Sequence, residues 1–116
     1  MSTSVQFIDG LNEEISSISL RKRRSSNAKI VVLFFNRLAA LEKGRSFTNN
    51  IEMVLLRDEE GDIQVSPRSM KFKFDDDELV QAECSFEVDS DGEWDRVMRF
   101  FHRYAEDHNL EFSTPS

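Results

Sequence analysis

Cysteine, proline and glycine are scarce in this 116-residue chain, which contains one cysteine, two prolines and four glycines. The single cysteine, Cys84, excludes an intramolecular disulfide framework and any zinc or iron–sulfur site that needs several cysteines. The glycines are scattered singly, so no glycine-rich loop for phosphates is present. No apolar run approaches the roughly 18 residues of a membrane span. The N-terminus lacks the basic and apolar regions of a signal peptide.

Acidic residues outnumber basic ones, with 22 Asp and Glu against 15 Lys and Arg and a formal net charge of −7. A general nucleic-acid binder is normally basic overall, so this balance argues against that class. The hydrophobic fraction of 39% is enough to bury a core, and the length suits a single domain. We therefore expect a small, acidic, intracellular protein with one domain over residues 1–116.

The charges are unevenly distributed along the chain. Between Asp75 and Asp95 there are ten acidic residues and no Lys or Arg. Such an uneven distribution steers and orients a docking partner in a salt-sensitive way. The alternative is that the charged runs are only solvated loops and faces. The first thirty positions hold three acidic residues and five basic ones, Arg21, Lys22, Arg23, Arg24 and Lys29.

Short apolar runs separated by turn residues predict β-strands in the first 36 residues. Residues 5–8 form the first, which is closed by an Asp-Gly turn. Residues 15–36 predict a β-hairpin with the basic residues near its tip, because 25–27 are the turn formers Ser-Ser-Asn. Its second strand, 30–35, has six consecutive apolar residues. It is therefore either covered on both faces or has an outer face that awaits a partner.

An antiparallel meander is predicted over residues 51–88. Its first hairpin connection contains Gly61, which supplies the positive φ that such a loop needs. Pro67 cannot donate to a ladder, which predicts an edge position or a bulge for the return strand. Apolar and polar residues then alternate through 70–74 and 80–88, as in strands with one buried face.

Residues 91–108 predict an amphipathic helix. Ser90 begins a capping box, and apolar side chains follow at helical spacing from Trp94 onward. Phe100 lies beside this stripe, either as a second packing contact or as an exposed anchor. The predicted fold class is therefore α+β. It is an antiparallel β-sheet or small sandwich of five to six strands over about residues 5–88, with the C-terminal amphipathic helix packed on it.

Signals for catalysis or metal binding are weak. His102 and His108 are six residues apart and so lie on different sides of the helix, whereas a metal pair prefers a spacing of about four. Cys84 falls on the inward face of a strand, where a thiol is usually an apolar filler. The acidic run at 87–92 starts like a calcium loop, but Met98 occupies the position of its closing Glu. We expect no metal, no cofactor and no catalytic residue.

The basic run at 21–24, Arg-Lys-Arg-Arg, is the most suggestive cluster. It suits nucleic-acid phosphates, anionic lipid headgroups, or carboxylates and acidic patches of a protein. No aromatic side chains are interleaved with it, which weakens the nucleic-acid interpretation. The alternative without a binding role is a charged hairpin tip that keeps the protein soluble.

The C-terminal run at 93–113, Glu-Trp-Asp-Arg-Val-Met-Arg-Phe-Phe-His-Arg-Tyr-Ala-Glu-Asp-His-Asn-Leu-Glu-Phe-Ser, resembles a signature of the Psb28 family, the small extrinsic assembly factors of photosystem II. Residues 56–63 resemble the central hairpin of that family, and residues 5–8 resemble its N-terminal strand. The resemblance covers nearly the whole chain. The segment 23–29 lacks the glycines of the family pattern, and the proline expected after the third strand is absent. The chain thus resembles a divergent or second-type member.

The resemblance implies a non-catalytic protein that lies peripherally on the cytoplasmic face of the thylakoid membrane. It implies transient binding to assembly or repair intermediates of photosystem II, near the core antenna subunit, the reaction-centre subunits and the secondary quinone site. In the family, the C-terminal tail of the antenna protein extends the β-sheet of the factor. We expect a monomer that binds no nucleic acid.

We predict a partner-binding surface made of the basic residues and the apolar strand that follows them. A sheet with an open edge binds an extended segment through main-chain hydrogen bonds, and the strand at 30–35 is the candidate edge. Competing interpretations are an RNA- or ribosome-binding protein that uses the basic loop, and a small enzyme. The predicted partner-binding residues are Arg21, Lys22, Arg23, Arg24, Lys29, Val31, Leu33 and Phe35.

Overall fold

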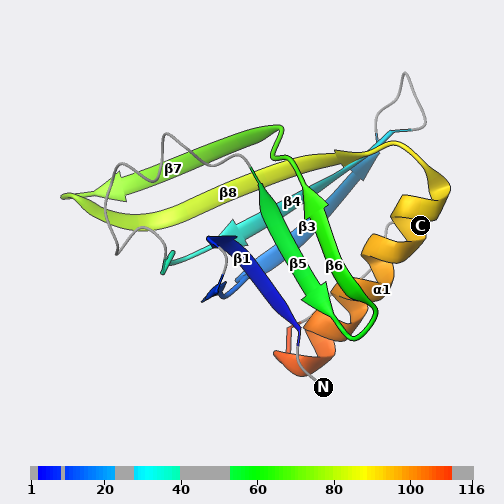
Figure 1. Cartoon of the computed structure of the whole chain (residues 1–116). Helices are drawn as coiled ribbons and strands as arrows, with labels where there is room; N and C mark the ends of the chain where they lie inside the picture. Colours follow the sequence, from blue (N-terminus) through cyan, green and yellow to red (C-terminus); the bar gives the residue numbers. More distant parts are fainter. Residues whose placement is uncertain (1–2, 9, 23–27, 40–52, 111–116) are drawn as a thin grey trace.

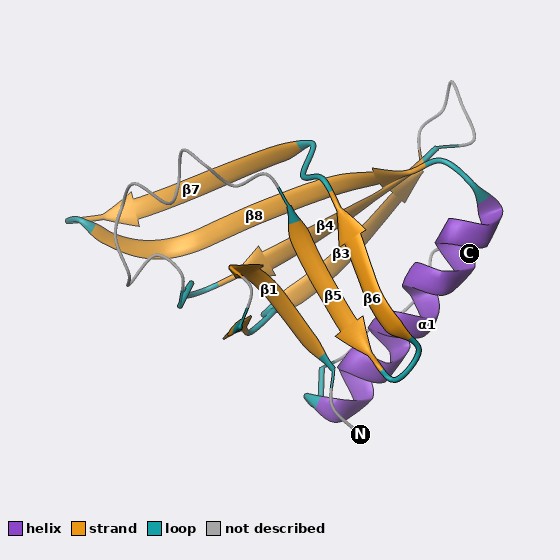
Figure 2. Cartoon of the chain, in the orientation of Figure 1, coloured by secondary structure: helices purple, strands orange, loops and turns teal. Residues whose placement is uncertain are grey.

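The computed structural model describes residues 3–8, 10–22, 28–39 and 53–110. In these residues eight β-strands precede one α-helix (Figure 1; Figure 2). The α+β class is confirmed, with eight strands where the sequence predicted five to six. The elements are β1 (Ser4–Ile8), β2 (Leu11–Glu13), β3 (Ser17–Lys22), β4 (Lys29–Phe35), β5 (Val54–Asp58), β6 (Gly61–Val65), β7 (Ser69–Asp75), β8 (Glu78–Val88) and α1 (Asp91–Asp107).

The strands form two antiparallel four-stranded sheets. The first sheet has the strand order β2-β1-β5-β6, and the second has the order β3-β4-β8-β7. The chain crosses from the first sheet to the second between β6 and β7, at 66–68. The single meander predicted over 51–88 is therefore wrong. Alternation of apolar and polar residues shows which side chains are buried, but it does not show which strands pair.

The hairpin between β5 and β6 forms as predicted. Gly61 has φ +124°, a backbone conformation that residues with a side chain rarely adopt. The Glu60 N–H donates a hydrogen bond of 2.9 Å to the carboxylate of Asp58, and such a bond from the backbone two residues on stabilises a turn. The turn therefore presents three consecutive acidic residues, 58–60, in a defined conformation.

Pro67 lies where the chain leaves the first sheet. β6 is an edge strand of that sheet and β7 is an edge strand of the second, so the predicted edge position of the return strand is confirmed. The N–H of Arg68 donates a hydrogen bond of 2.6 Å to the carbonyl oxygen of Ser85. This bond attaches the chain to β8 as it enters the second sheet.

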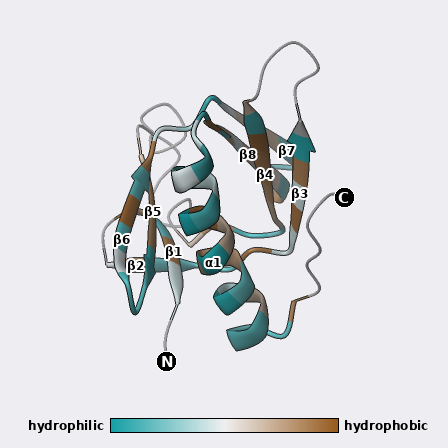
Figure 3. Cartoon of the chain, turned by 90° about the vertical axis from the view of Figure 1, so that its right-hand side faces the viewer, coloured by the Kyte–Doolittle hydropathy of each residue, from teal (hydrophilic) through white to brown (hydrophobic). Residues whose placement is uncertain are grey.

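The helix α1 begins after Ser90, as the capping residues predict. The Ser90 side chain accepts a hydrogen bond of 3.1 Å from the Glu93 N–H, which is the usual geometry of an N-cap. Phe100 is fully buried, so it is a packing contact and not an exposed anchor. Trp94 is partly buried and packs against the core. In the side view of Figure 3, α1 runs along the open side between the edges of the two sheets.

One hydrophobic core joins both sheets and the helix. The first sheet contributes Val5 and Leu56, the second contributes Leu33 and Phe86, and α1 contributes Phe101. The rings of Phe86 and Phe101 stack with their centroids 6.5 Å apart, a separation typical of favourable aromatic pairs. The helix therefore completes the core along the side that the two sheets leave open.

Candidate functional site

The basic residues predicted as a binding surface lie on and beside the β3–β4 hairpin. Arg21 is exposed on β3, and Lys22 is the last residue of that strand. Lys29 begins β4, and its Nζ lies 4.6 Å from the centre of the Trp94 ring, a cation–π contact. Residues 23–24 of the predicted surface lie outside the described part of the chain. Arg21 and Lys29 thus lie at the same end of the second sheet.

The strand at 30–35 is not a sheet edge. β4 pairs with β3 on one side and with β8 on the other, so it is a central strand. The side chains of Val31, Leu33 and Phe35 are fully buried and face the core instead of a partner. The prediction of an edge is wrong here because an apolar run indicates that side chains are buried and does not show how many strands pair with it.

The alternate residues of β4 form an apolar stripe on the outer face of the second sheet. Ile30 and Phe34 are partly exposed, and Val32 between them is buried. The neighbours of Val32 across the two ladders, Ser19 and Ser85, have small side chains. The sequence left open whether this strand is covered on both faces or has an uncovered outer face. At Ile30 and Phe34 the outer face is partly uncovered.

The open edges of the second sheet are β3 and β7. No strand of the described residues is paired with β3 on the side away from β4, and such an edge is the kind of place where a strand can be added. Arg21 and Lys22 lie near its C-terminal end. β3 is therefore the edge that lies next to the basic residues.

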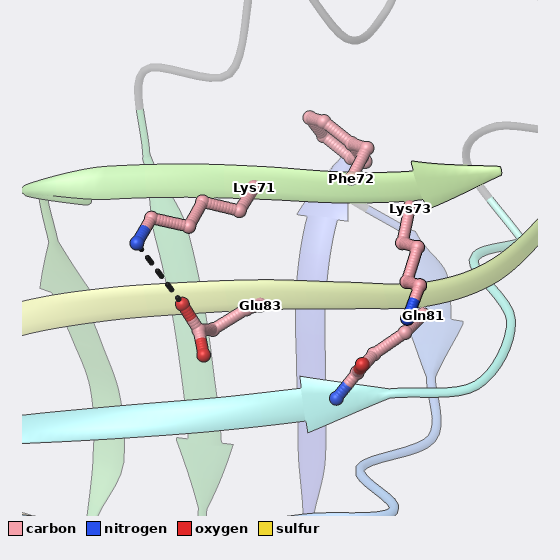
Figure 4. A pocket seen from close by; sticks show the side chains of 5 residues that line it. All are labelled: Lys71, Phe72, Lys73, Gln81 and Glu83. Carbon is pink, nitrogen blue, oxygen red and sulfur yellow. Dashed lines mark ion pairs between the residues drawn. The ribbon is translucent and has the colours of Figure 1, made fainter.

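Lys71 and Lys73 lie on the outer face of the β7–β8 pair (Figure 4). The Nζ of Lys71 is 3.9 Å from the Glu83 carboxylate, Lys73 extends toward Gln81, and Phe72 points the other way. The hollow lined by these five residues has a volume of about 160 Å³. This is smaller than the roughly 300–1,000 Å³ of ligand pockets, so the surface suits contact with a protein better than capture of a cofactor.

A larger groove of about 460 Å³ lies between β6, the end of β8 and the first turns of α1. Ile63 and Val97 are apolar members of its lining, and Arg96 is a charged one. The guanidinium of Arg96 donates hydrogen bonds of 2.6 and 2.8 Å to the Asp58 carboxylate. Because this cation is already paired, it is not available to hold a substrate anion.

The cysteine and the two histidines lie in surroundings that do not favour catalysis or metal binding. Burial raises the pKa of the Cys84 thiol to about 12, so the thiol stays protonated at neutral pH. The ring of His108 stacks on Tyr104 with centroids 4.0 Å apart, and His102 is exposed. Within residues 3–8, 10–22, 28–39 and 53–110, no group of three or more His, Cys, Asp or Glu residues is placed to hold a metal ion.

An ion-pair network that was not predicted joins α1 to the β5–β6 turn. Arg103 donates a hydrogen bond of 3.0 Å to the carboxylate of Asp58, which Arg96 also binds. Arg99 donates hydrogen bonds of 2.9 and 3.0 Å to Glu60. The bond from Arg96, followed by that from Arg103, lowers the pKa of Asp58 to about 2 against the cost of burial. The bonds from Arg99 and Arg103 lower the pKa of Glu60 to about 2.

The sequence does contain a signal for this network. Arg96, Arg99 and Arg103 follow each other at spacings of three and four residues, which aligns them on one face of a helix. Their partners are far away in sequence, in the turn at 58–60, and no pattern in the chain pairs the two segments. The network is therefore a product of the tertiary structure.

Comparison with known proteins identifies the family. A family model described as "Psb28 protein" matches residues 5–112. The chain belongs to the Psb28 family. The resemblance carried by residues 93–113 is thereby confirmed.

Relatives of this Psb28 family member match it over nearly their whole length. The "Photosystem II reaction center Psb28 protein" of Acaryochloris marina is 32% identical over 114 residues, which cover 97% of this chain and 98% of the relative. The protein of the same name from Trichodesmium erythraeum is 34% identical over 95% of each chain. The "Photosystem II assembly factor Psb28 protein" of Thermosynechococcus vestitus is 33% identical over 93% of this chain and 90% of the relative.

The described part of this Psb28 family member contains one helix, α1. With 17 residues and a charged outer face, it is neither long nor apolar enough to cross a membrane, and the described residues contain no other candidate. Of the predicted binding residues, the structure places Arg21 and Lys29 at the exposed end of a hairpin and three apolar residues in the core.

Proposed function

We propose that this protein is a non-catalytic assembly factor of photosystem II that binds immature complexes transiently and peripherally. The observation that carries the proposal is the family match over residues 5–112, together with full-length relatives named for the photosystem II reaction centre and its assembly. The protected thiol of Cys84 and the paired guanidinium of Arg96 support a role without catalysis. The protein acts as a monomer on the cytoplasmic face of the thylakoid membrane, near the core antenna subunit and the secondary quinone site.

Binding occurs by strand addition at β3. The C-terminal tail of the antenna subunit pairs with the free side of β3, where main-chain hydrogen bonds supply affinity. The neighbouring basic residues, Arg21, Lys22, Arg23, Arg24 and Lys29, contact acidic groups of the complex. This choice of strand rests on the central position of β4 and on the edge position of β3 next to the basic residues.

Hydrogen exchange with a synthetic antenna-tail peptide tests the edge. Added peptide is expected to protect amides of 17–22, while amides of 29–35 change little because their ladder bonds already exist. The reference is a peptide of the same composition in scrambled order. Equal protection by both peptides, or none at 17–22, contradicts binding at β3.

A pull-down from detergent-solubilised thylakoid membranes tests the function itself. We expect the intact protein to recover core antenna and reaction-centre subunits, identified by mass spectrometry, and an Arg21/Lys22/Arg23/Arg24→Ala variant to recover fewer. Equal recovery with both proteins keeps the assembly role and removes the basic residues from the interface. Recovery with neither protein overturns the role in photosystem II.

The alternative of an RNA- or ribosome-binding protein has less support. The reported relatives are named for photosystem II, and the formal net charge of −7 disfavours contact with phosphates.

A further inference from the structure

The β7–β8 hairpin extends past the rest of the second sheet. The pairing of β4 with β8 ends at Phe35 opposite Ala82, whereas β7 pairs with β8 as far as Asp75 opposite Glu78. Residues 78–81 of β8 therefore have β7 on one side and no strand of the described chain paired on the other. Figure 1 shows this two-stranded end projecting on the side of the molecule away from α1.

The projecting end carries exposed apolar side chains. Within the described residues, three large hydrophobic side chains are exposed, and two of them, Phe74 (42% exposed) and Val80 (43% exposed), lie here. The ring of Phe72 stacks on that of Phe74 with centroids 6.5 Å apart. The pairing register shifts between Lys73 and Phe74, so that Val80 is the extra residue of a bulge. Bulges of this kind re-aim side chains at functional surfaces.

Charge defines the kind of surface that this end fits. The turn between the two strands is acidic, and all four of its residues, 75–78, are exposed. Carboxylates next to apolar side chains are repelled by anionic lipid headgroups, which disfavours a membrane surface. Two copies of the same acidic end would also repel each other across a symmetric interface. A protein surface with Lys or Arg side chains around an apolar recess is complementary both to the acidic charge and to the apolar side chains of this end.

The fold places the two ends of the acidic run of the sequence on separate surfaces. β8 spans 11 residues, or about 33 Å at the rise of an extended strand. Residues 75–78 lie at its start, whereas the acidic residues that follow it lie by the N-terminus of α1, where Lys29 meets Trp94. Of these two acidic surfaces, the projecting end is the one on which the described residues also include large exposed apolar side chains.

We propose that the projecting β7–β8 end, residues 72–80, is a second docking surface, which inserts Phe74 and Val80 into an apolar recess ringed by Lys or Arg on a protein partner. The partner is a subunit of the photosystem II complex, so this inference rests on the function proposed above. β7 and β3 are the opposite edges of the second sheet. The partner therefore contacts this protein at both edges, and the two contacts are separable by mutation.

The test compares a Phe74→Ser/Val80→Thr variant with the intact protein in titrations against detergent-solubilised thylakoid complexes. Bound core antenna and reaction-centre subunits are quantified by mass spectrometry. The two side chains would become buried in the complex, and truncation of such apolar anchors is expected to weaken binding about tenfold or more. The matched control is Ile8→Ser, which alters the third exposed hydrophobic side chain, on β1, and is expected to leave affinity within about twofold. Circular dichroism and urea unfolding verify that both variants fold.

A charge variant tests whether the acidic turn meets Lys or Arg side chains of the partner. Asp75→Asn/Asp76→Asn/Glu78→Gln is expected to slow association and to flatten its dependence on salt. Asn tolerates the positive φ of Asp76, so the turn is retained. The control variant removes the same number of charges at three exposed positions elsewhere, Glu14, Asp95 and Glu106. Its association is expected to keep the salt dependence of the intact protein.

The outcomes separate this inference from the proposed function. If the Phe74→Ser/Val80→Thr variant binds the complexes as tightly as the intact protein, the projecting end is not a docking surface, and the assembly role stands. If the intact protein recovers no photosystem II subunit, both proposals are wrong. Protection of β3 by the antenna-tail peptide is expected to be the same in the variant and the intact protein, because the peptide contacts the other edge.

Discussion

The carboxylate of Asp58, whose side chain is fully buried, accepts hydrogen bonds of 2.6 and 2.8 Å from the guanidinium of Arg96. Arg103 donates a third bond, of 3.0 Å, to the same carboxylate. The bonds join the β5–β6 turn of the first sheet to α1, whereas α1 meets the second sheet through aromatic contacts such as that of Phe101 with Phe86. The helix thus shares one core with both sheets and is joined to the first sheet by ion pairs as well.

Replacement of Asp58 by Asn is expected to lower the free energy of unfolding by about 3 kcal/mol. Asn keeps the shape of the side chain but removes the buried charge that both guanidinium groups bind. Arg96 and Arg103 then keep only the partly exposed carboxylates of the same turn as partners, so we expect a loss of the size measured for broken buried pairs. Urea denaturation followed by circular dichroism measures the change. The control is Glu59→Gln, because Glu59 makes only a partly exposed contact of 3.1 Å with Arg103 and should cost less than about 1 kcal/mol. Equal losses in the two variants contradict a special role for Asp58.

The stability of the protein is expected to fall as the pH decreases from about 4 to about 2. The hydrogen bond from Arg96 lowers the pKa of Asp58 from 3.8 to about 2 in the folded protein. A group whose pKa is lower in the folded state stabilises it fully above the unfolded pKa, and this contribution is lost as the pH falls through the folded pKa. Urea midpoints measured across this range should decline less steeply in Asp58→Asn than in the intact protein. Parallel curves for the two proteins contradict the assignment to Asp58.

Tyr104→Phe is expected to destabilise the protein by about 1–3 kcal/mol. The N–H of Ile15 donates a buried hydrogen bond of 2.9 Å to the Tyr104 hydroxyl oxygen, so the substitution leaves a buried donor without its acceptor. The bond joins α1 to the segment before β3. Amide exchange measured by NMR should accelerate at Ile15 more than at Leu33 in the central strand β4. Unchanged exchange at Ile15 shows that the bond contributes little.

Cys84 is expected to resist alkylation in the folded protein. At pH 8 a thiol with a pKa of about 12 has a thiolate fraction roughly a thousandfold lower than an ordinary cysteine. Iodoacetamide labelling followed by mass spectrometry should therefore require urea. A Ser85→Cys/Cys84→Ala variant places the thiol on the opposite, partly exposed face of β8 and should react without denaturant. Rapid labelling of the native protein at Cys84 contradicts the buried position.

Much of the local structure was predictable because it depends on neighbours in the chain. Ser90 starts α1 as its side chain predicts, and Gly61 closes the β5–β6 hairpin. β2, which has only three residues, was missed because so short a strand leaves no clear alternation. The meander over 51–88 was wrong because β6 and β7 have the same alternating pattern in different sheets.

The candidate site was predictable only in part. Of the basic residues, Arg21, Lys22 and Lys29 lie at the adjoining ends of β3 and β4, as the turn residues between them predict. Residues 23–24 lie outside the described part of the chain. The choice of the strand at 30–35 as the sheet edge was wrong, because hydrophobicity reports burial and not the number of paired neighbours. The projecting end of β7 and β8 was not predicted, because its exposure follows from where β4 stops pairing, at Phe35.

The amino-acid sequence alone determined the fold class, the position of α1, the hairpin turns and the family, since these depend on periodicity, capping and a distinctive run of residues. The tertiary structure decided which strands share a sheet, that β3 and not β4 is the edge beside the basic residues, and that Arg96 meets Asp58. Those pairings join residues distant in the chain. Their energies depend on shared burial and geometry, which no local pattern specifies.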